Sequence, residues 1–242
     1  MRLAPLVLAA AGALSFAAAA YPGTSHNALD AGHPIPAAWA AAGTFDKVSA
    51  AGPDSVRFTT GYRWQVRAEG DARTLDRLRF LVEDGQLVVG RRTSADKTKL
   101  PTATIYVTAP SIRAATLAGS GAFAVDRLSG EQVSATVAGS GDLTVDTVAA
   151  RSLTGTIAGS GDLTVAGKAD SARLTVAGSG TFDGHAFHAG DANATIAGSG
   201  SAVFHSDGTV AAHISGSGNV TVQGRATCHQ SRSGSGSLRC GG

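Results

Sequence analysis

Thr156-Ile157-Ala158-Gly159-Ser160-Gly161 is one copy of the pattern that decides the fold of this 242-residue chain. Its Gly-Ser-Gly core occurs seven times, and successive copies start 20, 20, 19, 20, 18 and 18 residues apart. The corner glycines are Gly119 and Gly121, Gly139 and Gly141, Gly159 and Gly161, Gly178 and Gly180, Gly198 and Gly200, Gly216 and Gly218, and Gly234 and Gly236. A nearly fixed period with glycines and β-branched residues predicts a solenoid. The leucine and asparagine ladder of leucine-rich repeats is missing, which favours a coiled β-helix.

Apolar residues keep fixed positions around these corners. Two residues before the first glycine stand Leu117, Val137, Ile157, Val176, Ile196 and Ile214. Four residues after it stand Phe123, Leu143, Leu163, Phe182, Ala202, Val220 and Leu238, and six after it Val125, Val145, Val165, Gly184, Phe204, Val222 and Cys240. Polar residues alternate with them, as strands require. Residues 111–242 therefore predict an all-β, right-handed parallel β-helix of about seven turns of ~20 residues, stacked ~4.8 Å apart.

The corners themselves have a structural explanation. Glycine adopts positive φ without a Cβ penalty, and the serine between the two glycines can bond locally to the backbone. The last turn departs from the pattern, because Arg232 stands where an apolar residue is expected, as in a capping repeat. Cys228 and Cys240 are the only cysteines and lie 12 residues apart. A disulfide that staples the open end is favoured over free or metal-bound thiols.

The N-terminus has the pattern of a secretory signal peptide. Arg2 precedes an apolar stretch that ends in three alanines, which predicts residues 1–20 as the leader and cleavage after Ala20. A membrane anchor is the weaker alternative, and no transmembrane segment is expected after signal cleavage. The protein is then exported, to the periplasm or to the cell surface and extracellular space. Residues 21–42, rich in proline and alanine, are interpreted as a flexible tether, of which Trp39 could dock on the body of the protein.

Residues 43–110 are predicted to form a β-rich N-terminal section. Strands are expected at 45–50, 55–59, 62–67 and 102–108, and one helical turn at 74–78. Residues 80–83 and 86–89 flank Asp84-Gly85, a strong hairpin signal. Arg91, Arg92, Lys97 and Lys99 belong to a basic loop that would either meet an acidic surface or simply be solvated.

Composition narrows the function classes. The formal net charge is only +2 and aromatic residues make up 5% of the chain, which points neither to nucleic acid nor to a large enzyme core. No catalytic elbow, phosphate loop or dinucleotide fingerprint is present. We therefore expect no catalytic residues, no cofactor and no metal site.

Several weaker candidates have simpler structural explanations. Asp142 and Asp162 follow two corners, but two carboxylates in seven repeats cannot line a row of calcium sites, so turn capping is favoured. His185, His188 and His205 would bind a transition metal only if they shared a face, and scattered surface histidines are the simpler interpretation. A polysaccharide lyase would need clustered carboxylates with Arg or Lys. The nearest residues for that role are Asp142, Asp146, Asp162, Arg151 and Lys168, which are sparse.

A candidate binding face recurs three residues before the corners. It consists of Thr116, Thr136, Thr156, Thr175 and Thr195. Such a hydroxyl row would suit a glycan, the edge of another solenoid, or ice. The alternative is that threonine simply suits an exposed strand position.

The order of these pieces resembles a known family. Phe45-Asp46-Lys47-Val48, the segment Val82-Glu83-Asp84-Gly85-Gln86-Leu87-Val88-Val89, and Leu117-Ala118-Gly119-Ser120-Gly121 follow one another as in the head-GIN-domain family of putative autotransporter adhesins. The resemblance covers about residues 43–225 and implies a secreted or envelope β-helical protein with an adhesive role. It supplies no catalytic residues.

The expected function is a non-enzymatic adhesion or structural binding module of the bacterial cell envelope, with a glycan or an envelope protein as partner. A carbohydrate-active β-helix and a self-assembling envelope scaffold are the alternatives.

Overall fold

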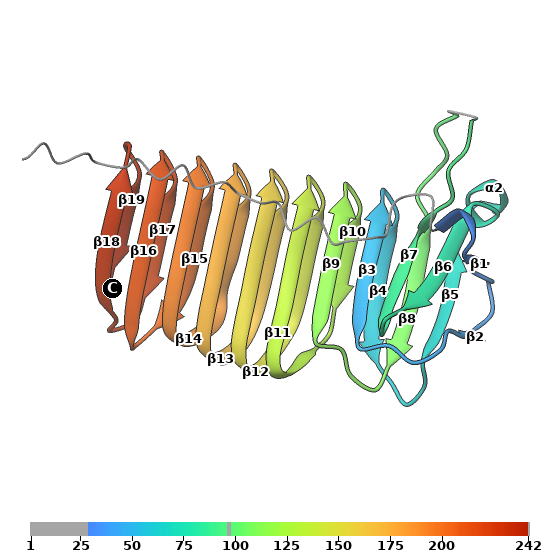
Figure 1. The fold of residues 1–242 in the computed structure, drawn as a ribbon, viewed down its shortest axis with the longest axis horizontal. Coiled ribbons are helices and arrows are strands. Elements are labelled where there is room, and N and C mark those ends of the chain that lie inside the picture. Colours follow the sequence, from blue (N-terminus) through green and yellow to red (C-terminus); the bar gives the residue numbers. More distant parts are fainter. Residues whose placement is uncertain (1–28, 96–97, 242) are drawn as a thin grey trace, which may run out of the picture.

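The computed structural model describes residues 29–95 and 98–241, and these form one continuous, almost entirely β structure (Figure 1). The N-terminal strands are β1 (His33–Pro34), β2 (Ala40–Ala41), β3 (Lys47–Gly52), β4 (Ser55–Thr60), β5 (Gln65–Glu69), β6 (Leu78–Glu83), β7 (Gln86–Arg91) and β8 (Thr104–Ala109), with one short helix, α2 (Ala72–Leu75). The repeat strands are β9 (Ala114–Gly119), β10 (Ala122–Val125), β11 (Leu128–Gly139), β12 (Asp142–Gly159), β13 (Asp162–Gly178), β14 (Thr181–Gly198), β15 (Ser201–Ser206), β16 (Thr209–Gly216), β17 (Asn219–Gln223), β18 (Thr227–Ser233) and β19 (Ser237–Cys240). The predicted signal peptide, residues 21–28 of the predicted tether and Lys97 lie outside the described residues.

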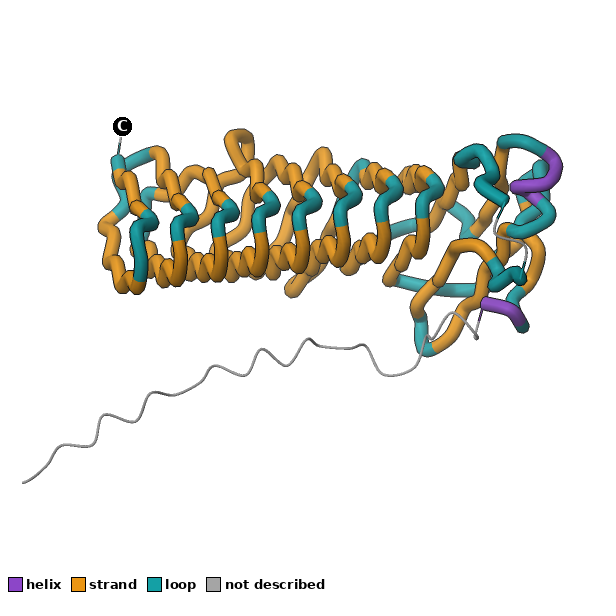
Figure 2. The backbone as a smooth tube through the Cα atoms, turned by 90° about the horizontal axis from the view of Figure 1, so that it is seen from above, coloured by secondary structure: helices purple, strands orange, loops and turns teal. Residues whose placement is uncertain are grey.

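Strands β9 to β19 pair only in parallel and coil into the predicted solenoid. Figure 2 shows the loops at the successive Gly-Ser-Gly corners aligned in one row along its length. The solenoid has about six turns rather than seven. The difference is small and arises because seven corners delimit six full repeats.

The predicted apolar columns fill the interior. Leu117, Val137 and Ile157 stack in register and are fully buried, and Ile196 and Ile214 continue the same row. Phe182, Phe187 and Phe204 are the bulkiest side chains of the later turns and are almost completely buried. Burying these rows removes the apolar surface of every coil from water, which is the main stabilisation of a stacked repeat.

Both glycines of a corner are required by close contact between coils. The amides of Ser160 and Gly161 both donate to the carbonyl oxygen of Gly139, each at 3.0 Å. Gly159 has φ +132°, and a Cβ there would overlap the oxygen of Gly139. A Cβ on Gly161 would overlap the oxygen of Gly141 and approach Val137 Cγ1 at 2.8 Å. The first glycine is therefore fixed by backbone conformation and by space, the second by space alone.

The solenoid extends further toward the N-terminus than the repeats indicate. Strands β3 and β4 pair in parallel with β9 and β10. Residues 47–60 therefore form a coil that stacks on the first coil with a Gly-Ser-Gly corner. Its corner is Gly52-Pro53-Asp54, and Gly52 O accepts from Gly121 N at 3.0 Å. On the other side, β3 and β4 pair in parallel with β7 and β8, which come later in the chain. The N-terminal section thus contributes two further layers, stacked out of sequence order.

Antiparallel strands close this end of the molecule. Strand β5 pairs with β8, and β6 pairs with β7 through the predicted hairpin, where Asp84 and Gly85 have φ of 50° and 71°. The expected strand at 62–67 begins only at Gln65, because Tyr62 projects fully into solvent and Trp64 turns to donate from Nε1 to Phe45 O at 2.9 Å. The helical turn lies at Ala72–Leu75, slightly before its predicted position.

The prediction of a flexible tether is wrong for residues 29–42. Strands β1 and β2 pair with β6 and β5, and Leu29 and Ile35 are each only 3% exposed. The guanidinium of Arg67 lies 5.1 Å from the ring centroid of Trp39 and 4.1 Å from that of Tyr106. The proline and alanine content of this segment is typical of a linker, yet the segment covers the edges of the antiparallel strands.

The C-terminal end is closed covalently, as expected. Cys228 and Cys240 occupy inward positions on β18 and β19 and form a disulfide across the coil. Arg232 continues the row of Ile214 but is exposed, and its Nη1 donates to Gly236 O at 3.3 Å. The last coil is thus capped by a disulfide and a charged side chain instead of an apolar layer. Among the described residues, no helix is both long enough and apolar enough to cross a bilayer.

Candidate binding face

The five threonines form an uninterrupted row on one sheet of the solenoid. Register pairs join Thr116 to Thr136, Thr136 to Thr156, Thr156 to Thr175, and Thr175 to Thr195. Each threonine is half-buried between its neighbours. The row continues to Ser49 on β3 at one end and to His213 and Ser231 at the other.

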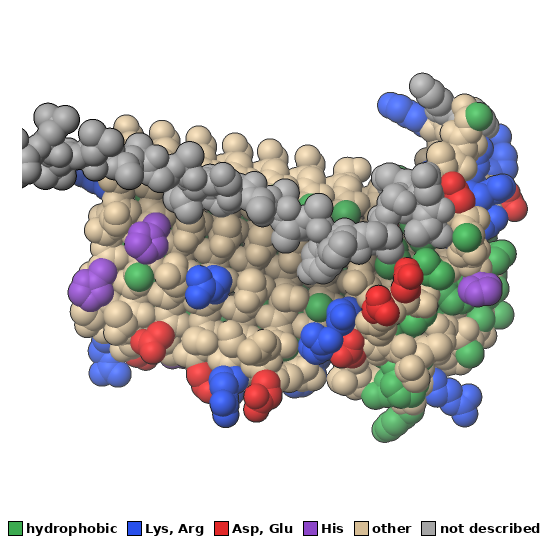
Figure 3. All heavy atoms as spheres, in the orientation of Figure 1, with side chains coloured by type: hydrophobic (Ala, Val, Ile, Leu, Met, Phe, Trp, Pro, Cys, Tyr) green, Lys and Arg blue, Asp and Glu red, His purple; other side chains and the backbone are tan. Residues whose placement is uncertain are grey.

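Small residues flank the threonine row on its corner side. The next outward position in the same strands is alanine in five successive coils: Ala118, Ala138, Ala158, Ala177 and Ala197. In the orientation of Figure 1, where these strands face the viewer, the part of this face that is visible in Figure 3 consists mostly of uncharged polar side chains and backbone, with a few basic and histidine side chains. Threonine and alanine side by side therefore give a band of small side chains along the corner side of this face.

This face is regular because its strands keep one register. The pairings of β9, β11 and β16 with their neighbours run without a shift. Register shifts occur between Val145 and Val148, Thr164 and Ala166, and Gly184 and His188, all on the far side of the coil. Variation in repeat length is thus absorbed there, and the threonine face stays in line.

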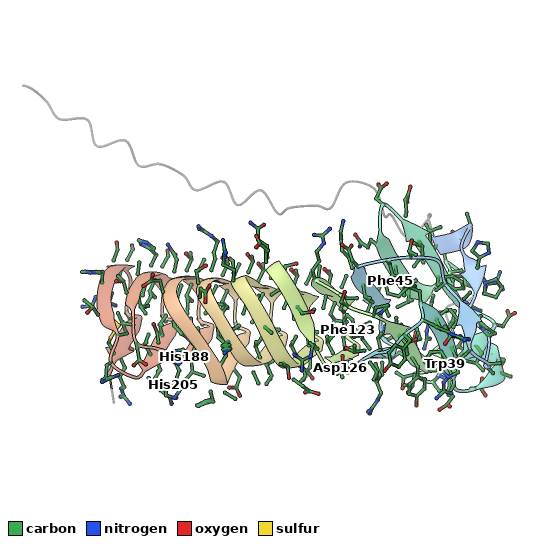
Figure 4. All side chains as sticks on the ribbon, turned by 90° about the horizontal axis from the view of Figure 1, so that it is seen from below. Trp39, Phe45, Phe123, Asp126, His188 and His205 are labelled. Atoms are coloured by element: carbon green, nitrogen blue, oxygen red, sulfur yellow. A yellow bond between two sulfur atoms is a disulfide. The ribbon has the colours of Figure 1, made fainter. Side chains whose placement is uncertain are left out.

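The three histidines lie close to the register shift between Gly184 and His188. His188 and His205 stack on adjacent coils with ring centroids 6.4 Å apart (Figure 4). His188 Nε2 is 3.8 Å from Asp207 Oδ2, while His185 pairs with Asp183 at 2.6 Å. The hydrogen bonds from His185 lower the pKa of Asp183, and the hydrogen bond from the Arg225 amide lowers that of Asp207. Within the described part of the chain, no three metal-ligating side chains converge, so the three histidines do not share a site.

The residues closest to a lyase pattern are separated in space. Asp142 and Asp162 are register partners just after the Gly-Ser-Gly corner, and Asp162 Oδ1 accepts from Thr181 N at 2.9 Å. Asp146 follows on β12, whereas Arg151 and Lys168 lie around the next corner. Asp162 therefore acts as a turn cap, whereas Arg151 and Lys168 lie on a different part of the coil.

The basic loop is less free than its sequence indicates. Arg91 binds both oxygens of Asp54 at 2.7 Å, and Asp54 is buried. Arg92 pairs with Asp76 at 3.0 Å, and Lys99 is exposed. Neither alternative for the loop, an acidic surface or simple solvation, holds for Arg91, because its guanidinium is committed to a structural ion pair.

Two shallow hollows lie beside the corner that joins the two sides of the coil. One, of about 310 Å³, is lined by Lys168, Asp170 and His188 over small residues. The other, of about 320 Å³, opens on the threonine side and is lined by Arg173, Asp191 and Asn193. The repeat pattern does not single out Arg173 and Asn193, although both stand two residues before a threonine of the row and so point to the same side.

The comparison with protein families decides which group this architecture represents. The family described as putative auto-transporter adhesin, head GIN domain, matches residues 44–226. The chain belongs to this family. The match covers the threonine row and both hollows, so the candidate face is part of the head GIN domain itself. It ends just before the two cysteines.

Solved structures share the fold of this head GIN domain. A putative adhesin from Bacteroides fragilis matches with a TM-score of 0.75 and 18% identity, over 84% of this chain and 94% of that one. A putative lipid binding protein from Parabacteroides distasonis matches with a TM-score of 0.66 and 22% identity, over 86% and 98%. A putative adhesin from Parabacteroides merdae gives 0.65 and 18%, over 84% and 94%. No curated protein matches the sequence significantly.

Proposed function

We propose that this protein is an exported, non-enzymatic binding module of the bacterial cell envelope and that it adheres through the threonine face. The observation that carries the proposal is the unbroken row from Thr116 to Thr195, flanked by alanines on a sheet without register shifts. A flat face of small side chains lets an extended partner contact several coils at once. The hydroxyls offer hydrogen bonds at a spacing of about 4.8 Å, set by the strands.

Membership of a family of putative adhesins supports an adhesive role, and the Cys228–Cys240 disulfide supports an oxidising compartment. Export is tested by expressing the full chain in a bacterial host and sequencing the N-terminus of the released protein. Cleavage after Ala20 would leave Tyr21 as the first residue. Retention of the leader in a cytoplasmic product would overturn the exported part of the proposal.

The binding face is tested with two matched double variants. Thr156→Gln with Thr175→Gln places longer side chains in the row, whereas Thr144→Gln with Thr164→Gln makes the same changes in register partners on the far side of the same coils. Binding of the mature chain to whole cells and to immobilised envelope polysaccharide is measured. We expect at least a fivefold loss for the first variant and no change for the second. Equal binding by both variants would exclude this face.

A further inference from the structure

The hollow on the threonine side has the chemistry of a ligand site. Its volume is about 320 Å³, at the small end of the range of about 300–1,000 Å³ for ligand pockets. Its polar lining comes from four coils: Ser152, Ser171, Arg173, Asp191, Asn193 and Thr209. The nearly buried Ala172 and Ala192 lie between these polar side chains. The hollow adjoins the threonine row, because Arg173 and Asn193 precede Thr175 and Thr195 by two positions.

Register brings the key side chains together. Arg173 on β13 pairs directly with Asn193 on β14. Ser171 pairs with Asp191, and both stand two residues earlier in the same strands and so point to the same side. Partners in a parallel ladder lie about 4.8 Å apart, within reach of a single small ring. A guanidinium, a carboxamide, a carboxylate and a hydroxyl therefore surround one hollow.

Several of these groups have no partner within the protein. Among residues 29–95 and 98–241, neither the guanidinium of Arg173 nor the side-chain carboxamide of Asn193 makes a hydrogen bond or ion pair. Asp191 uses Oδ1 to accept from Thr209 N at 2.7 Å, and Oδ2 is left for another donor. The hollow thus gathers a donor fork, an amide and a carboxylate oxygen that can all bind a ligand without first breaking an internal contact.

The donor and acceptor pattern fits a sugar that carries a carboxylate. Arginine presents a planar fork of N–H donors that matches a carboxylate in bidentate geometry. An asparagine amide and an aspartate oxygen can together accept from and donate to neighbouring ring hydroxyls. The adjacent threonines would continue these hydrogen bonds along an extended chain.

We propose that this hollow binds one acidic sugar unit of a polysaccharide, with Arg173 on its carboxylate and Asn193 and Asp191 on its hydroxyls. The inference rests on the proposed binding function and assigns the chemical class of its ligand. An acidic protein segment would also satisfy Arg173, but it would leave the hydroxyl-binding groups unused.

Calorimetric titration of the mature chain tests the assignment. The probes are oligosaccharides of galacturonate, mannuronate and hyaluronan, the methyl ester of the galacturonate oligomer, and poly-L-glutamate. We expect at least one acidic oligosaccharide to bind. For galacturonate, esterification, which removes the charge and keeps the ring, is expected to weaken binding about tenfold or more. Poly-L-glutamate should bind at least tenfold more weakly than the best saccharide.

Three variants locate the site. Arg173→Gln should weaken binding about tenfold, and Asn193→Ala severalfold, since both are surface changes that leave the coil intact. Arg239→Gln removes the same charge from β19 on the other side of the solenoid and should change affinity less than twofold. Circular dichroism confirms that each variant is folded.

The outcomes separate this inference from the proposed function. If Arg173→Gln binds as the unaltered protein does, if poly-L-glutamate binds equally well, or if no acidic saccharide binds, the saccharide site is excluded. Adhesion to cells that still depends on Thr156 and Thr175 would then leave the proposed function standing. If the unaltered protein shows neither adhesion to cells nor saccharide binding, both the saccharide site and the proposed function are overturned.

Discussion

Arg91 grips Asp54 through two hydrogen bonds, from Nε to Oδ2 and from Nη2 to Oδ1, each 2.7 Å long. Asp54 Oδ1 also accepts from Ala103 N at 2.8 Å, so one buried carboxylate joins the corner after β3 to the end of β7 and to the residue that precedes β8. The hydrogen bond to Asp54 raises the pKa of Arg91 further above its usual value. This ion pair lies beyond the Gly-Ser-Gly corners and connects the layer of β7 and β8 to the coil formed by β3 and β4.

Asp54→Ala should destabilise the protein by about 3 kcal/mol, because it leaves a largely buried guanidinium and an amide without their acceptor. Asp76→Ala, which removes an exposed partner of Arg92, should cost less than about 1 kcal/mol. Urea unfolding at pH 7 measures both. Similar losses for the two variants would show that the Asp54 pair is no stronger than a surface pair.

Gly159→Ala should destabilise the solenoid by at least about 3 kcal/mol, since the residue has positive φ and its Cβ would overlap Gly139 O. Ser160→Ala, one position along, should change stability by less than about 0.5 kcal/mol because the serine side chain is exposed. Thermal unfolding followed by circular dichroism compares them. A tolerated alanine at 159 would mean that the corners can separate without cost.

Replacing both Cys228 and Cys240 by serine should destabilise the last coil by about 3 kcal/mol, on the chain-entropy estimate for a short loop. The effect should be local, because each coil contacts mainly its neighbours. Hydrogen exchange followed by mass spectrometry should show faster exchange in β18 and β19 and unchanged protection in β11 and β12. Uniform loss of protection along the chain would instead indicate that the disulfide supports the whole solenoid.

Stability should fall in acid partly through Asp183. Its pKa is lowered by the His185 side chain and amide, which bind the charged form. A carboxyl with a lowered folded pKa contributes stability above its unfolded pKa of about 3.9, and that contribution disappears as pH falls through the folded value. The difference in melting temperature between the unaltered protein and Asp183→Asn should therefore shrink as the pH falls from ~5 to below ~4. A difference that does not depend on pH would contradict this.

The repeats could be predicted because their information is local. A corner glycine, the apolar residue at Ile157 and the outward threonine at Thr156 obey period-two alternation around a fixed point, and every coil repeats the rule. The layer formed by β3 and β4 could not be found in this way. Its corner, Gly52-Pro53-Asp54, does not have the Gly-Ser-Gly motif. Strands β7 and β9 lie on either side of β3 in space, but both follow β3 in the chain.

The candidate site divides along the same line. The threonine row is visible in the sequence, because a position that repeats with every coil must stack on itself. The hollow at Arg173 and Asn193 is not, since it depends on which different residues meet across coils and on which of them the protein leaves without partners.

The sequence by itself determined that this chain turns at seven glycine corners, which side chains fill the coil and which face outward, because sterics at glycine and strand alternation act over a few residues. Only the tertiary structure decided that residues 29–42 pack on the body, that Arg91 is committed to Asp54, and that free polar groups converge beside the threonine face. Those features arise from contacts between segments far apart in the chain, for which no local pattern exists.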